Sequence, residues 1–257
     1  FEGSGMSALL DVLSYNTHYL SFHANMLANE MFLDSAALRS SVVSHAKTLG
    51  YEVRSVRAPK AKINVFLNDI SLPTATMNSG QVFTSRIDNV NYQFVTVSDF
   101  TASQIGSGLL FADVPIYEGT YVNTRYTVDN TNVDQRFILT SNVSDTSTLT
   151  VKVQNSSTDS TTVAYTKATD ITQLTGTSAV YYLQESEDGL FEVYFGDDVV
   201  SKALSDGNIV ILNYVVTNIG EANGAFSFTA SGAINTVTNI DTTTIEAANG
   251  GASAESI

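Results

Sequence analysis

The side chains that could do chemistry in this sequence are mainly carboxylates. Asp197 and Asp198 follow Gly196 at the end of a predicted strand, and neighbouring carboxylates can bind a divalent cation. Glu192 and Asp197 could also form the pair of carboxyl groups that a glycosidase uses. Any acidic β protein offers such pairs, however, and Gly-Asp-Asp is also typical of a turn whose side chains accept hydrogen bonds from their own backbone. We therefore expect a turn here, with neither a metal site nor a catalytic site.

Other groups that carry out catalysis or hold metals are absent or badly spaced. His18 and His23 are five residues apart, whereas a metal-binding pair on a helix is four apart, so we expect packing or interface roles for them. The chain has no Cys, which excludes thiolate nucleophiles and Cys-based zinc sites. It has no Gly-x-Ser-x-Gly motif and no glycine-rich phosphate loop. We expect no enzymatic activity and no cofactor.

The strongest structural signal is a long apolar helix over residues 9–34. A surface helix needs only one apolar stripe, with side chains three or four residues apart. This segment has two stripes, and a helix that is apolar on two sides must be covered on two sides, which indicates a protein built for assembly. The first stripe comprises Leu9, Leu13, Leu20, Leu27 and Met31, and the second comprises Val12, Tyr15, Tyr19, Phe22 and Met26.

A second helix is expected to cover one of the two stripes. Ser4 or Ser7 can cap the first helix, and Asp34 or Ser35 can cap the second, which continues to about residue 49. The tight turn between them predicts a helical hairpin. We expect the leucine stripe to face the second helix and the stripe that contains Tyr19 to face another chain, although the two roles could be exchanged.

A basic extended segment, residues 51–62, follows the helices. Arg54 and Arg57 in this segment could dock on an acidic partner surface, or they could be solvated side chains of a plain connector, and we leave both interpretations open. The chain as a whole is acidic, with a formal net charge of −14, and the part after Lys62 has 21 acidic residues and 6 basic ones. Phosphate contacts need cations, so we expect no direct binding of nucleic acid.

The length and hydropathy of the chain indicate a globular protein. At 257 residues and 43% hydrophobic content it can bury a sizeable core in one or two domains. No run of eighteen apolar residues occurs, so we expect no membrane insertion. No signal peptide is visible, and the start at Phe1 suggests a fragment of a longer chain.

From residue 63 onward the apolar residues alternate with polar ones at a period of two, which predicts many short strands. The fold class is therefore α+β: an N-terminal helical hairpin followed by mainly antiparallel β-sandwich or meander modules. We place a helical assembly region at residues 1–58, a first β-rich domain at 59–175 and a second β module at 176–230. Residues 231–257 are expected to be a linker or the start of a further domain.

Several long blocks occur in a fixed order along the chain: FEGSG (1–5), LLDVLSYNTHY (9–19), residues 25–51, VPIYEGTYV (114–122), QRFIL (135–139) and residues 181–225. Together they resemble the large baseplate wedge protein of T-even-like contractile-tailed phages. The last block also resembles the broader baseplate J-like group. The resemblance covers about residues 1–230, and one departure is Asp198, where a glycine is common.

This resemblance implies a structural protein of the virion tail baseplate. Members of the family form the inner ring of the baseplate, pair with themselves and clamp helices of another wedge protein, and the ring changes shape when the tail sheath contracts. We therefore expect a scaffold that assembles through its N-terminal helices and relays this change. The expected partners are a second copy, in a dimer within a wedge, and other wedge proteins.

Two other functions are compatible with the residues. A receptor-binding or glycan-binding tail module would show an exposed aromatic cluster, for which Tyr117, Tyr121 and Tyr126 are the candidates. A tail-associated glycosidase would use carboxylates such as Glu192 and Asp197 in a cleft, one of them with a raised pKa.

Overall fold

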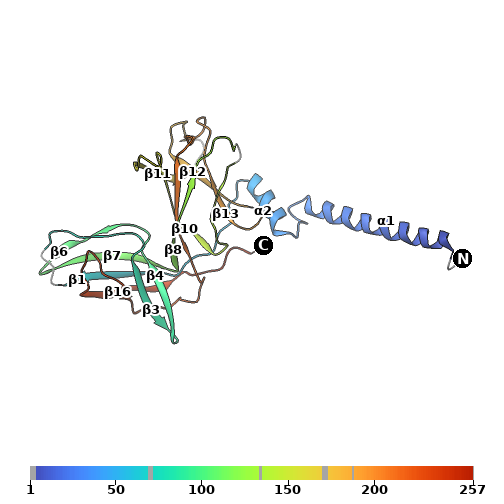
Figure 1. Ribbon diagram of the computed structural model, residues 1–257. Coiled ribbons are helices and arrows are strands. Elements are labelled where there is room, and N and C mark those ends of the chain that lie inside the picture. Colours follow the sequence, from blue (N-terminus) through green and yellow to red (C-terminus); the bar gives the residue numbers. More distant parts are fainter. Residues whose placement is uncertain (1–3, 69–71, 133–134, 170–172, 187, 257) are drawn as a thin grey trace. The chain divides into compact units, whose positions relative to one another are not determined.

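The computed structural model describes residues 4–68, 72–132, 135–169, 173–186 and 188–256. Residues 1–3 of the first family block therefore lie outside the described part. The chain divides into two compact units. One contains the helices together with the turn at 185–189, and the other contains the remaining residues from Arg54 onward. The predicted α+β class is confirmed, with helices first and a mainly antiparallel β region after them (Figure 1).

Helix α1 (Gly5–Glu30) begins where the sequence predicts it to begin. Ser4 is the N-cap residue, with an extended backbone, and its side chain accepts a hydrogen bond from the Ser7 N–H at 3.3 Å. The 26-residue helix is about 39 Å long, at 1.5 Å per residue.

Helix α2 (Arg39–Thr48) is shorter than predicted, and the expected cap at Asp34 or Ser35 is wrong. Its N-cap is Leu38, which has no side chain able to accept a hydrogen bond. The Ser35 hydroxyl donates instead to the Asn29 carbonyl, at 2.6 Å, and so closes the end of α1. Ser35 therefore belongs to the turn after α1 and does not cap α2, which starts four residues later.

The first sheet has the strand order β15-β3-β4-β7-β1-β16, with β6 paired to β7. Strand β1 alternates between buried and less buried positions, which reflects the alternation of apolar and polar residues in KAKINVFL. Asp88 and Asn89, both with positive φ, form the two-residue turn between β3 and β4. The strands are β1 (Lys60–Leu67), β3 (Val82–Ile87), β4 (Val90–Val95), β6 (Ser103–Ile105), β7 (Gly108–Glu118), β15 (Thr229–Ala230) and β16 (Ile240–Asn249).

The second sheet has the strand order β8-β14-β10-β11-β12-β13-β9. Strand β14 lies inside this sheet and is buried along nearly its whole length, as its run IVILNYVV suggests. Strands β11 and β12 are parallel, an exception in the β region. The strands are β8 (Thr120–Thr127), β9 (Phe137–Ile138), β10 (Ser144–Gln154), β11 (Thr162–Lys167), β12 (Val180–Glu185), β13 (Phe191–Tyr194) and β14 (Ile209–Val216). A separate two-stranded sheet joins β2 (Thr76–Met77) to β5 (Phe100–Thr101).

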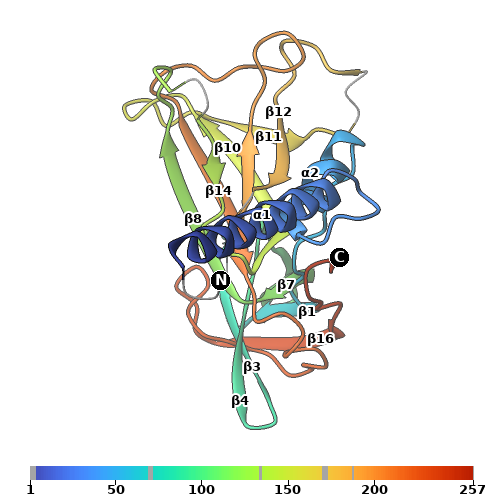
Figure 2. The same ribbon diagram turned by 90° about the vertical axis from the view of Figure 1, so that its right-hand side faces the viewer.

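Each large sheet encloses its own hydrophobic core. Ile63, Phe83 and Phe94 belong to the first core, and Leu212 and Tyr214 belong to the second. Figure 2 shows β1, β7 and β16 of the first sheet apart from β8, β10 and β14 of the second sheet. Residue 175, where we expected a domain boundary, lies between β11 and β12 of one sheet, and residues 240–249 supply β16 to the first sheet.

Candidate assembly interface

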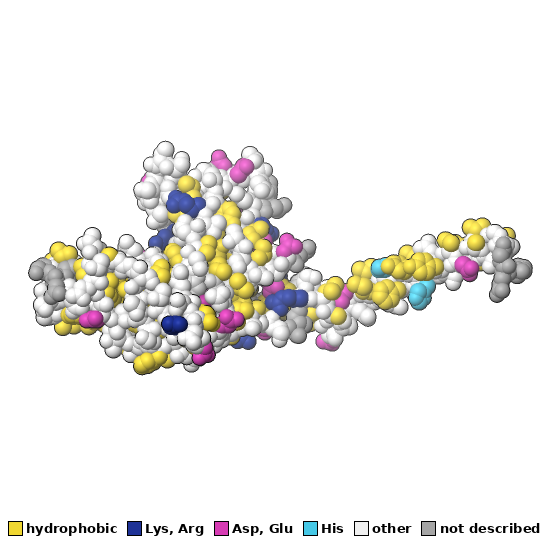
Figure 3. Space-filling view, turned by 60° about the horizontal axis from the view of Figure 1, so that its bottom comes forward, with side chains coloured by type: hydrophobic (Ala, Val, Ile, Leu, Met, Phe, Trp, Pro, Cys, Tyr) yellow, Lys and Arg dark blue, Asp and Glu magenta, His cyan; other side chains and the backbone are white. Residues whose placement is uncertain are grey.

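Among the described elements, helix α1 stands out because its apolar side chains are exposed along its whole length. None of its residues is buried. In Figure 3, hydrophobic side chains gather along much of the visible face of the helix. Eleven large hydrophobic side chains of α1 are exposed, among them all five of the predicted interface stripe: Val12, Tyr15, Tyr19, Phe22 and Met26.

The leucine stripe is exposed as well, so our expectation that it faces the second helix is wrong. Leu9, Leu13, Leu20 and Leu27 are 59–69% exposed. A 10-residue helix is only about 15 Å long, too short to cover the 26-residue α1. Met6 and Leu10 are exposed as well and extend this surface beyond either predicted stripe, which the spacing of the stripes did not indicate. Both sides of α1 are thus available.

Aromatic rings and an imidazole are clustered in the middle of α1. The Tyr15 and Tyr19 ring centroids are 5.6 Å apart, and the His23 ring lies edge-on to Tyr19 at 4.8 Å and to Phe22 at 5.8 Å. The i, i+4 spacing of a helix brings Tyr15, Tyr19 and His23 into line. Because these rings have large apolar faces and a polar edge, they are the type of residue that anchors protein interfaces.

The end of α1 is tied to the start of α2 by the Glu30 carboxylate. It accepts hydrogen bonds from the backbone N–H groups of Ala37 and Leu38, at 3.0 and 3.3 Å. The Ala37 hydrogen bond, followed by one from the Ser41 side chain, lowers the pKa of Glu30 below its ordinary value. His45 Nε2 lies 2.9 Å from the Glu30 carbonyl oxygen. Glu30 thus holds residues 37 and 38, which directly precede α2, against the end of α1.

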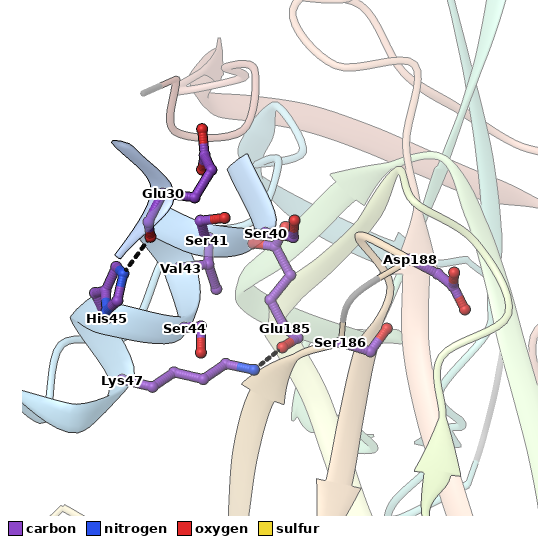
Figure 4. Close-up of a pocket in the computed structure, with 10 residues that line it drawn as sticks. All are labelled: Glu30, Ser40, Ser41, Val43, Ser44, His45, Lys47, Glu185, Ser186 and Asp188. Atoms are coloured by element: carbon purple, nitrogen blue, oxygen red, sulfur yellow. Dashed lines mark hydrogen bonds between the residues drawn. The ribbon is translucent and has the colours of Figure 1, made fainter. Parts of the chain in front are cut away.

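A second polar contact joins α2 to the turn at 185–189, within the same compact unit. Arg39 donates from Nε and Nη2 to the two carboxylate oxygens of Glu185, at 2.8 and 2.9 Å, and the Glu185 side chain is only 4% exposed. The Lys47 ammonium donates to the Glu185 carbonyl. Figure 4 shows Lys47 and Glu185 at an open depression of about 680 Å³, with Ser40 and Ser44 on its wall. The depression is polar, unlike the surface of α1.

The basic connector is fixed to the C-terminal end of its own chain. Arg54 Nε lies 3.7 Å from Glu255 Oε2, and its side chain is 67% exposed. Arg57 forms an antiparallel bridge with Ala252, with N–H···O distances of 2.9 and 3.0 Å, and its side chain is exposed. Both guanidinium groups keep a surface on which a partner can bind.

The Gly196-Asp197-Asp198 segment forms a self-capped turn. The Asp198 carboxylate accepts from the Ala203 N–H at 2.8 Å, and the Asp198 N–H donates to the Ser201 carbonyl at 2.9 Å. Asp197 accepts from the Val199 N–H at 3.2 Å. Asp198 has φ +66°, a conformation that glycine adopts more easily, which explains why glycine suits this position.

The other candidate site residues are also used inside the fold. Glu192 lies 3.4 Å from the Arg136 guanidinium and accepts from the Gln184 amide. Tyr117 and Tyr121 are half-buried around the small core at the junction of the two sheets, and the Tyr126 hydroxyl donates to the Ile138 carbonyl at 2.6 Å. These three tyrosines therefore do not form the exposed cluster that a glycan-binding module would present.

Within the described residues, no group of three or more His, Asp or Glu side chains is arranged to hold a metal ion. No helix in the same part of the chain is both long and apolar enough to cross a membrane. Among the described residues, the prominent exposed apolar surface is that of α1. Exposed apolar side chains along a helix are typical of the class of structural proteins that associate with other chains.

The comparisons with known proteins specify this class. Residues 1–51 match the family described as "Baseplate wedge protein gp6-like, helical domain", and residues 122–217 match "Bacteriophage baseplate wedge protein gp6, third domain". Baseplate wedge protein gp6 of Enterobacteria phage T4 is 27% identical over an alignment of 262 positions that covers 94% of this chain. The resemblance to baseplate wedge proteins of T4-like phages is confirmed, and with it the expected place in the virion tail baseplate.

The matched segments follow the elements of the structure. The helical-domain match contains α1 and α2, and the third-domain match begins within β8 and ends just after β14. The third-domain match thus coincides with the second sheet. The chain spans 38% of the length of the T4 relative. These findings favour a structural protein over an enzyme.

Proposed function

We propose that this protein is a scaffold of the phage tail baseplate wedge and that it assembles through α1. The observation that carries the proposal is the exposure of apolar side chains on two sides of this helix. A surface helix needs one apolar stripe at most, so a helix with two exposed apolar sides is expected to bind other elements on both. Burying one Leu or Phe side chain contributes about 1.5–3 kcal/mol, so a few such contacts can hold two chains together.

A second copy of the chain is the first partner that we propose for α1. The helix carries two charged residues, Asp11 and Glu30, and no Lys or Arg. Two copies therefore bring little like charge together when their apolar faces meet. Val12, Tyr15, Tyr19, Phe22 and Met26 supply one of these faces. The opposite face, with Leu13 and Leu20, is left for a helix of another wedge component.

The proposal also includes movement. A scaffold whose helices are shared with other chains transmits a displacement of those chains to its own β region. We propose that the protein relays in this way the change of the baseplate that accompanies sheath contraction. The exposed Arg54 and Arg57, at the start of the β region, are proposed contacts for acidic surfaces of neighbouring subunits.

The experiment is light scattering on the purified chain across a dilution series, with Tyr19→Ser/Phe22→Ser as the test variant. We expect the unmodified chain to be a dimer and the variant to be a monomer with an unchanged β-sheet circular dichroism signal. Val199→Ser/Phe226→Ser is the matched control, because these side chains are 74% and 65% exposed outside α1. A variant that retains the dimer mass would contradict the role assigned to this stripe.

A further inference from the structure

Two buried carboxylates lie where the two large sheets and the connector meet. Glu118 is 0% exposed and Asp145 is 1% exposed. Burying a charge is costly unless hydrogen bonds compensate for the lost water. In the described part of the chain neither carboxylate has a cation within ion-pair distance. Neutral donors must therefore satisfy both of them.

Glu118 connects the end of the first sheet to the end of the second. It is the last residue of β7, and Gly119 then leads directly into β8 of the other sheet. Its carboxylate accepts from the Thr217 hydroxyl at 2.6 Å, the Asn218 N–H at 3.0 Å and the Asn218 side-chain amide at 2.7 Å. Thr217 and Asn218 directly follow β14, so this one side chain joins β7 to the second sheet.

Asp145 connects the second sheet to the connector. Its Oδ2 accepts from the Ala58 N–H at 2.9 Å, and its Oδ1 accepts from the Ser147 N–H and hydroxyl at 2.9 and 2.6 Å. The pairing of β10 with β14 shifts register between Asp145 and Thr150, which lets this part of β10 reach the connector. The Ser55 hydroxyl accepts from the N–H of residue 146 at 3.0 Å and adds a further bond.

Apolar packing also joins the connector to both sheets. A small core of Ala58, Val95 and Val215 takes one residue from the connector and one from each sheet. At the β7–β8 corner Gly119 has φ +125°, and a Cβ there would lie 2.2 Å from the Val216 carbonyl oxygen. No side chain can therefore be inserted at this corner without displacing β14.

From these contacts we infer that Glu118 and Asp145 hold the two large sheets and residues 54–58 together as one rigid body. The connector is then a fixed arm of the β region rather than a flexible linker. A displacement that reaches Arg54 moves both sheets together. This inference concerns the β region alone and stands whether or not α1 is a dimer interface.

The rigidity of the β region is tested by measuring the distribution of distances between the two sheets. The chain has no Cys, so Thr243→Cys on β16 and Ala164→Cys on β11, both exposed, give one spin label per sheet without other changes. Electron–electron resonance of the full chain, diluted with unlabelled protein to remove intermolecular pairs, should give a single narrow distance distribution. A broad distribution in the otherwise unmodified chain would overturn the inference.

The decisive variant is Asp145→Asn. If the new amide oxygen stays at the position that bonds Ser147, its NH₂ group faces the Ala58 N–H, and two donors cannot bond each other. We expect the distance distribution to broaden and the Ala58 amide to exchange about tenfold or more faster, as the loss of a hydrogen bond to a charged group implies. An unchanged distribution together with unchanged exchange would overturn the inference.

Further variants distinguish the loss of these particular hydrogen bonds from the loss of a negative charge in general. Glu118→Gln should retain the narrow distribution, because the Asn218 side chain can rotate and accept from the new amide, whereas Glu118→Ala should broaden it. Asp241→Asn removes an exposed carboxylate of β16 that accepts from Asn68 at 2.9 Å, and it should change nothing. If this variant broadened the distribution as much as Asp145→Asn does, the inference would fail.

Discussion

At the residue scale, Asp159 illustrates how one carboxylate orders a polar loop. It accepts from the Asn155 side-chain amide at 2.8 Å and from the Thr161 N–H at 2.9 Å, and these bonds, the Asn155 bond first, lower its pKa from 3.8 to about 2. A lowered pKa means that the bonds stabilise the loop fully above the ordinary pKa and are lost as the pH falls through about 2.

We therefore predict a carboxyl NMR titration midpoint near pH 2 for Asp159. Replacing the first donor, in Asn155→Ala, should raise this midpoint toward 3.8. A midpoint that stays in place in this variant would mean that the Asn155 bond does not form in solution.

At the element scale, α2 depends on one long-range contact. The Arg39 guanidinium donates to both carboxylate oxygens of the nearly buried Glu185. Hydrogen bonds to a charged group contribute about 1.5–3 kcal/mol to stability. We predict that Arg39→Ala weakens α2 by about 2 kcal/mol, because it leaves a carboxylate without its partner. Amide hydrogen exchange over residues 39–48 measures the free energy of local opening.

Arg39→Lys is the matched variant for this contact. It keeps the charge but supplies one point donor instead of a planar fork, so we expect an intermediate effect. Equal exchange in the unmodified chain and in Arg39→Ala would show that α2 is held by packing around the buried Val43 instead.

At the scale of the whole molecule, the β region should be independent of the helices. Its sheets contain their own cores, and the residues from Arg54 onward form a separate compact unit apart from the short turn at 185–189. We predict that a chain starting at Arg54 folds, unfolds with a melting temperature close to that of the full chain, and is a monomer at concentrations where the full chain is a dimer. Calorimetry and light scattering on the two chains test this, and a truncated chain that still dimerises would place the interface in the sheets.

The local sequence pattern was sufficient to predict the elements whose formation depends on residues close together in sequence. The spacing of apolar residues in 9–34 predicted a long helix, and a serine before it predicted its start, because helix geometry and capping involve residues three or four apart. The period of two after residue 63 predicted strands for the same reason. The family resemblance, the turn at Asp197 and Asp198, and the apolar character of Val12 to Met26 also came from the sequence.

The tertiary structure alone decided which distant segments meet. Strand β1 pairs with β16, so that Lys60 lies opposite Asn249, and Arg39 meets Glu185 across 146 residues. Glu118 and Asp145 gave no signal, because a carboxylate in a strand looks the same whether it faces water or a buried donor. The exposure of both faces of α1 also depends on the length and position of α2, which local periodicity does not encode. Sequence fixes what a segment prefers, whereas burial and pairing depend on contacts between segments far apart in the chain.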